Sequence, residues 1–90
     1  MSPDVVKGYR AISDAGAKTV QLSAKTRELI ALAVAVSLRC DGCIAVYTDA
    51  ALKHGATKEE IIEALGVAIG MNAGATLVYS ARVMDAFQEH

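Results

Sequence analysis

Aromatic residues are scarce in this chain of 90 residues, which has no tryptophan, one phenylalanine and three tyrosines. Hydrophobic residues nevertheless make up 53% of it, so its apolar surface is mostly Ala, Val, Ile and Leu. A chain this short buries only about 60–65% of the surface that its unfolded form exposes. The aliphatic content exceeds what one small core requires, which predicts a second buried face and therefore a homo-oligomer.

Neither sign of charge predominates, since nine basic and ten acidic residues leave a net charge of -1. Without a basic field, we expect no nucleic-acid partner and no attraction to anionic lipid. The longest apolar stretch, residues 29–38, is shorter than the roughly 20 residues of a membrane span, so we interpret it as a buried helix face. The opening Met1-Ser2-Pro3-Asp4 has no basic leader before an apolar run, which predicts a cytoplasmic protein without a signal peptide.

No run of alternating polar and apolar residues lies between turn residues, so no strand is expected. Internal repeats, low-complexity tracts and composition shifts are also absent. We therefore predict one all-α domain covering residues 1–90, a small helical bundle of about five helices with short connections. The expected helices span residues 3–16, 24–38, 40–54, 58–70 and 75–87.

Local signals mark where these helices begin and end. Ser23 is a suitable N-cap, and Thr57 opens the capping box Thr-Lys-Glu-Glu, which predicts a helix start. Gly16 and Gly55 lie where a left-handed residue commonly ends a helix. We predict that residues 71–74, Met-Asn-Ala-Gly, interrupt the helical pattern and separate the last two helices.

The only two cysteines, Cys40 and Cys43, lie three positions apart at the predicted start of the third helix. Residues with this spacing share a helix face, so they can form a disulfide or share a metal. Unpaired amide N–H groups and the helix dipole stabilise a thiolate at a helix N-terminus; Arg39 supports this effect and Asp41 opposes it. Two buried cysteines could also act as small hydrophobic residues. In a cytosolic chain, however, such a pair more often has a catalytic or metal-binding role.

A zinc site is disfavoured by the supply of ligands. Structural zinc takes four Cys or His ligands, and this chain contains two of each. His54 lies eleven positions after Cys43, about 16 Å along the same helix, so the two cannot share a metal within one chain. We therefore predict no metal and no cofactor.

Two further side chains, Glu28 and Tyr47, are candidates for a chemical role. Glu28 begins an apolar stripe, where it either serves as an early-helix acid favoured by the dipole or becomes desolvated and acts as a base. Tyr47 follows Cys43 by one turn. It is either a core aromatic or a hydrogen-bond donor to a thiolate or a bound oxygen.

Three segments, residues 26–33, 40–45 and 50–61, together resemble the alkylhydroperoxidase-D-like, carboxymuconolactone decarboxylase superfamily. The likeness covers about residues 22–87, and its features are a Glu twelve positions before the CxxC pair, the pair itself and the Gly-Ala-Thr capping segment. The resemblance implies an all-helical fold that assembles as trimers or hexamers. It argues against lactone decarboxylation, because the decarboxylase branch has no cysteine pair.

The resemblance also implies roles for individual residues. Cys43 corresponds to the cysteine that attacks peroxide, Cys40 to the cysteine that resolves it as a disulfide, and Glu28 to the proton-relay carboxylate. The family's relay His falls where this chain has Tyr47, which can donate a hydrogen bond but does not shuttle protons near neutrality. This departure weighs against peroxide turnover and leaves disulfide chemistry open.

The favoured interpretation is a thiol-dependent antioxidant oxidoreductase that reduces a peroxide or a disulfide and is reset by a dithiol donor. Its site residues would be Cys43, Cys40, Glu28 and Tyr47. One alternative is a non-enzymatic module that senses oxidant through the cysteines and serves as an assembly scaffold. The other is a non-redox small-molecule enzyme on the same fold, with Glu28 as its base.

Overall fold

Every regular element of this protein is a helix. The computed structural model describes all 90 residues, and it contains no strand. The predicted all-α class is therefore confirmed. The five helices, in chain order, are α1 (Pro3–Lys18), α2 (Ala24–Leu38), α3 (Asp41–Lys53), α4 (Lys58–Tyr79) and α5 (Ala81–Gln88).

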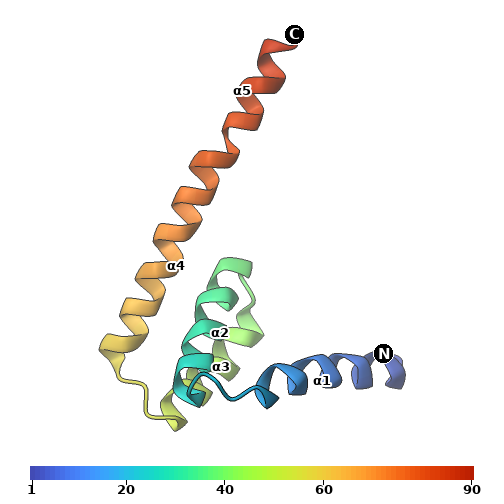
Figure 1. Cartoon of the computed structure of the whole chain (residues 1–90), viewed down its shortest axis with the longest axis vertical. Coiled ribbons are helices and arrows are strands. Elements are labelled where there is room, and N and C mark those ends of the chain that lie inside the picture. The colour runs from blue at the N-terminus through green and yellow to red at the C-terminus, as the bar shows by residue number, and fades with distance from the viewer.

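The helices α3 and α4 both pack against α2, which is therefore the central element. Figure 1 shows α1 extending to one side of α2 and α3, while α4 and α5 form a nearly straight arm that projects away from the other helices. The radius of gyration is 17.1 Å, whereas a compact domain of this length has about 12 Å. The single chain is thus far from compact.

The predicted helix caps are present where local sequence indicated them. The Ser23 hydroxyl oxygen accepts a hydrogen bond from the Thr26 amide at 3.1 Å. At the start of α4, Thr57 and Glu60 form both bonds of the capping box. Gly55 follows α3 with a φ of 86°, the left-handed conformation expected of it.

Two predicted boundaries are wrong. The first helix continues past Gly16 to Lys18, and α4 continues through residues 71–74 to Tyr79, with an interruption only at Ser80. A glycine inside a helix costs only about 1 kcal/mol relative to alanine. The Asn72 side chain supports the helix here, because its Nδ2 donates to the Ala68 carbonyl oxygen at 2.7 Å.

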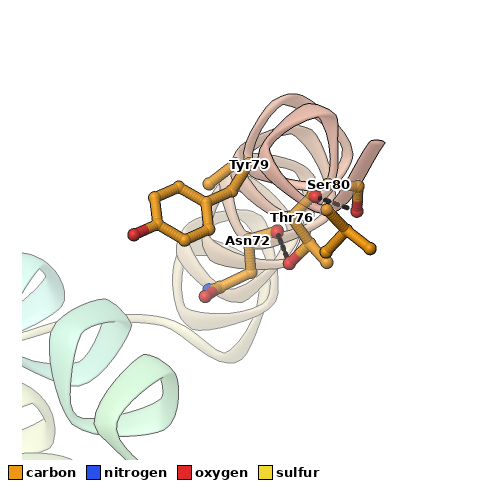
Figure 2. Close-up of a pocket in the computed structure, with 6 residues that line it drawn as sticks. Asn72, Thr76, Tyr79 and Ser80 are labelled. Carbon is orange, nitrogen blue, oxygen red and sulfur yellow. Dashed lines mark hydrogen bonds between the residues drawn. The ribbon is translucent and has the colours of Figure 1, made fainter. Parts of the chain in front are cut away.

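The same asparagine also connects two helices. Its Nδ2 lies 2.7 Å from the Ser37 hydroxyl oxygen of α2, so it links the arm to the central helix. Further along α4, the hydroxyls of Thr76 and Ser80 donate to the carbonyl oxygens of Asn72 and Thr76, respectively, at 2.8 and 2.7 Å (Figure 2). These side chains form a polar row along a helix that is otherwise largely apolar.

The core within one chain is very small. Five residues are buried, and four of them are alanines: Leu32, Ala35, Ala51, Ala56 and Ala68. Leu32, Ala51 and Ala56 form the central cluster, against which the half-buried Leu29, Tyr47 and Ile61 pack. Most large aliphatic side chains are exposed, including several from residues 29–38 that were expected to be buried.

The arm carries much of this exposed apolar surface. Residues Lys58–Gln88 form a helix that is long and apolar enough to cross a membrane, judged by length and composition alone. Core helices of soluble proteins pass the same test. Gly66 and Gly70 of α4 are not in close contact with another helix of this chain, because a β-carbon added at either position would meet nothing within 4 Å.

Candidate redox site

A tight turn between α2 and α3 positions the first cysteine. Arg39 adopts a left-handed conformation, with a φ of 55°, immediately after the last residue of α2. The Arg39 amide donates to the Val36 carbonyl and the Cys40 amide donates to the Ala35 carbonyl, at 3.2 and 3.0 Å. This pair of bonds is the Schellman arrangement, which ends one helix and allows the next to start at once.

Cys40 is the N-cap residue of α3, so its sulfur lies at the positive end of the helix. Its Sγ accepts a hydrogen bond from the Cys43 amide at 3.3 Å. The two cysteines are joined as a disulfide, and their Cα atoms are 5.2 Å apart. Both are half-buried. The prediction that this pair can meet as a disulfide at a helix N-terminus is confirmed.

An apolar hollow of about 320 Å³ borders the disulfide. Its walls come from α2 and from the start of α3, and none of the lining side chains carries a charge. The lining residues are Ala31, Val34, Ala35, Leu38, Cys40, Cys43 and Tyr47. An apolar group of modest size can therefore approach the sulfur atoms with little loss of hydration.

A second hollow, of about 420 Å³, lies beside the first and contains Glu28. It is bounded by the C-terminal half of α1 and by α2. Tyr47 and Ala31 line both hollows, so the tyrosine borders the hollow of the disulfide as well as that of the carboxylate. Tyr47 therefore borders the hollow beside the cysteine pair, whereas Glu28 lies in the neighbouring hollow, and the roles of both residues stay predictions.

The Glu28 carboxylate is incompletely satisfied. Its Oε2 atom is buried and has no hydrogen-bond partner. Such atoms are uncommon, because an unpaired buried oxygen loses its hydration without compensation. Of the two interpretations of Glu28, this arrangement favours a carboxylate directed into a site over a solvated early-helix acid.

Tyr47 stays protonated at neutral pH. The pKa of Tyr47 is raised above 10.0, first by the charge that Tyr9 can carry, then by burial, by hydrogen bonding with Tyr9 and by the charge of Glu28. A phenol with a raised pKa donates hydrogen bonds and does not serve as a base. The predicted donor role of Tyr47 is consistent with this environment.

Tyr9 is the residue near the site that sequence reasoning missed. Its side chain is mostly exposed, and its phenol contributes to the raised pKa of Tyr47. The only sequence signal was its place on the same face of α1 as Ser13, Gly16 and Ala17. These three residues line the hollow that contains Glu28.

The hollow on the arm has fewer reactive side chains than the two near the cysteines. A hollow of about 400 Å³ on the arm is lined by Asn72, Ala75, Thr76, Tyr79, Ser80 and Val83. Figure 2 shows Thr76 and Ser80 bonded to their own helix, and the lining contains neither a thiol nor a carboxylate. No group of three or more His, Cys, Asp or Glu side chains is arranged to hold a metal ion.

Comparison with known proteins gives consistent matches over most of the chain. A protein of Haemophilus influenzae is 47% identical over 85 residues, which are 94% of this chain and 75% of the relative. A protein of Cupriavidus necator is 33% identical over the same coverage. Uncharacterized protein 4 in the cox locus of Paracoccus denitrificans is 38% identical over 76% of this chain and 61% of its own length.

All three relatives are described as uncharacterized, so the similarity to them does not assign a reaction to this chain. The family model for the carboxymuconolactone decarboxylase family matches residues 3–86, from the start of α1 into α5. The all-helical fold and the cysteine pair agree with the resemblance noted in the sequence. The chain belongs to the carboxymuconolactone decarboxylase family.

Proposed function

We propose that this protein is a thiol-dependent oxidoreductase that cycles its Cys40–Cys43 pair to reduce a disulfide or a peroxide. The observation that carries the proposal is the disulfide at the start of α3, beside an open apolar hollow and near a carboxylate oxygen that has no partner. A structural disulfide requires neither the hollow nor the buried carboxylate. A catalytic one requires access for substrate and a group that takes up a proton.

In the reductive half of the cycle, a donor thiolate attacks the Cys43 sulfur and breaks the bond to Cys40. Cys40 is the better leaving group, because its sulfur already accepts the Cys43 amide hydrogen bond. The second donor thiol then displaces Cys43, so that the donor leaves as a disulfide and both cysteines are reduced. A reducing cytoplasm, where we expect this chain to work, would supply such a dithiol.

In the oxidative half, the Cys43 thiolate attacks the substrate. With a peroxide, the O–O bond breaks, Cys43 becomes a sulfenic acid and the substrate leaves as an alcohol. The Cys40 thiol then condenses with the sulfenic acid, which releases water and restores the disulfide. Glu28 accepts the thiol proton and passes it to the leaving alkoxide, which becomes the alcohol, while Tyr47 donates a hydrogen bond to that oxygen. With a disulfide substrate, the same two cysteines exchange without a sulfenic acid.

Single-cysteine variants test this assignment. Cys43→Ser should abolish turnover in an assay with tert-butyl hydroperoxide or a model aliphatic disulfide and excess dithiothreitol. Cys40→Ser should retain the first attack and accumulate a mixed disulfide or sulfenic acid on Cys43, which mass spectrometry detects. Glu28→Gln, which keeps the side-chain shape, should slow turnover by about 10²-fold. Unimpaired turnover in both cysteine variants would refute the proposal.

We also propose that the working form is a homo-oligomer, a trimer or a hexamer. A single chain buries only five residues and exposes many apolar side chains along the arm. In a monomer, this surface would leave too little buried area to offset the entropy of folding. Packing against other copies would cover the arm without a membrane or a nucleic-acid partner.

Light scattering coupled to gel filtration tests the assembly. A mass three or six times the chain's 9.4 kDa supports it. Replacing two exposed arm residues together, as in Ile69→Glu with Leu77→Glu, should dissociate the oligomer. A monodisperse folded monomer, or recovery only in detergent, would contradict the proposal, and the second result would favour a membrane.

A further inference from the structure

The surface of the single chain is too large for a protein of its mass. It exposes 7253 Å², whereas a compact monomer of 9.4 kDa exposes about 5,000 Å². The difference is roughly 2,200 Å² per chain, and obligate homo-oligomers bury about 1,000–2,500 Å² from each partner. A standard interface takes only about 800 Å² from each partner. The uncovered area therefore has the size of an obligate interface between copies of this chain.

The arm carries a long uncharged surface that its own chain covers on one side only. No charged residue occurs between Glu63 and Arg82. The covered side faces α2, where Ile61 packs against the central cluster and Asn72 bonds to Ser37. Beyond this point α5 contacts only α4. The other sides of the arm can be covered only by a partner from outside the chain.

A row of four large apolar side chains runs along the arm, about a third of a turn around the helix from the side that faces α2. Ile62, Ile69, Leu77 and Met84 follow one another at intervals of seven, eight and seven residues, close to two helical turns each. Each of them is more than half exposed. The backbone stays helical where α4 meets α5, so the row is continuous along the arm (Figure 1). Its spacing is the same from either end, and Ala73 is its midpoint.

We propose that this row packs against the same row of a second copy, with the two arms antiparallel and a two-fold axis at Ala73. The inference rests on the proposed homo-oligomer and extends it. In this register Ile62 meets Met84 of the partner subunit, and Ile69 meets Leu77 of the partner subunit. A two-fold contact requires such a self-complementary surface, because the same patch serves on both copies. The small side chain of Ala73 on the axis allows the two helices to approach.

A two-fold contact between arms distinguishes the two assemblies proposed above. A trimer with a three-fold axis has no two-fold axis, whereas a hexamer can combine three two-fold axes with the three-fold axis. Of the two assemblies, only the hexamer can contain antiparallel arm pairs. Three such pairs make up the working form.

A second copy fits the arm better than a lipid bilayer does. Lipid would have to surround the apolar stretch, but α2 covers one side of it as far as Asn72. Residues 73–88 extend beyond that contact to the end of α5. These sixteen residues are fewer than the roughly 20 of a membrane span, and they include Arg82 and Asp85.

Cysteine cross-linking tests the two-fold axis directly. In a background of Cys40→Ser with Cys43→Ser, Ala73→Cys places a thiol on the axis, where it meets the same thiol of the second copy. A disulfide requires β-carbons about 3.5–4.5 Å apart, so diamide should yield a covalent dimer at least about ten times faster than with Val78→Cys. Val78 is the matched control, because it is 75% exposed, against 76% for Leu77, but lies outside the row. Equal rates at the two positions, or no dimer from Ala73→Cys, would overturn the proposal.

Light scattering of charge variants is the second test. The parent should have an even number of copies, six for the proposed hexamer. Leu77→Glu should halve this mass, because the contact would bury a carboxylate without a partner. Val78→Glu should leave the mass unchanged, and equal masses for the two variants would overturn the proposal. A parent of three copies would overturn it too while leaving the homo-oligomer intact, whereas a monomeric parent would refute both. The redox function is tested separately by the cysteine variants.

Discussion

Reduction of the Cys40–Cys43 disulfide should lower the free energy of unfolding by about 2 kcal/mol. The cross-link closes a loop of only four residues, counting both cysteines. In the chain-entropy description, a loop of this size restricts the unfolded chain by about 2 kcal/mol at 25 °C, less than half of the value for a loop of 100 residues. A bond with so little effect on folding can be opened and closed repeatedly without unfolding the protein.

The folded state retains the interaction that Cys40 makes as a helix cap. Its sulfur accepts the Cys43 amide hydrogen bond, and a free thiol or thiolate at the same position can still do so. We therefore expect reduction to leave the Cys43 amide at the start of α3 hydrogen-bonded, with no further loss of stability from that group. The free energy of the folded state should change little on reduction. The loss of stability should therefore come mainly from the greater freedom of the unfolded chain.

Urea denaturation of the oxidised protein and of protein kept in a phosphine reductant measures the difference. Both samples need the same protein concentration, because the stability of an oligomer depends on it. The double variant Cys40→Ser with Cys43→Ser is the control and should respond to the reductant by less than about 0.5 kcal/mol. A loss of more than about 4 kcal/mol, or a reduced form that is the more stable one, would refute this reasoning.

Three further predictions concern the scaffold. Arg39→Gly should raise the free energy of unfolding by about 1 kcal/mol, because glycine has no β-carbon and adopts a φ of 55° without a clash. Gly55→Ala should lower the free energy of unfolding, because its φ is 86°. Denaturation curves of both variants and the parent measure these differences. The pKa of Glu60 is lowered, mainly by its hydrogen bond with Lys25, so the stability it contributes is present above about pH 4.5 and is lost on acidification. Glu60→Gln retains the capping geometry, so it should be less stable than the parent at pH 7 and equal to it near about pH 3; a pH-independent gap would contradict this. Asn72→Ala removes the side-chain bond from α4 to α2 and should cost about 1 kcal/mol, and no loss would mean that the bond is replaced by water.

Several features of this protein follow from short segments of sequence. Ser23 and Thr57 cap the helices that they were predicted to start, and Gly55 has the backbone conformation expected after α3. These features depend on hydrogen bonds between residues at most five positions apart. The placement of Cys40 and Cys43 at the start of α3 is local in the same sense, so the possibility of a disulfide was evident from their spacing.

The role of residues 71–74 could not be inferred from the same local signals. A Met-Asn-Ala-Gly segment is compatible with a break or with a continuous helix, and the difference in intrinsic preference is small. Asn72 supports the helix by bonding to Ala68, and it also contacts Ser37, which is 35 positions away in sequence. Packing between α4 and α2 is thus part of the reason that the helix continues.

By itself, the sequence determined the helical class, most helix ends and a cysteine pair at a helix N-terminus, because each depends on neighbours in the chain. Only the tertiary structure decided the surroundings of that pair. It buries Glu28 Oε2 without a partner, and it places Tyr47 in the lining of both the hollow beside the disulfide and the hollow that contains Glu28. These relations depend on how separate helices approach one another in space, and that approach is governed by the packing of distant side chains, which local preferences do not encode.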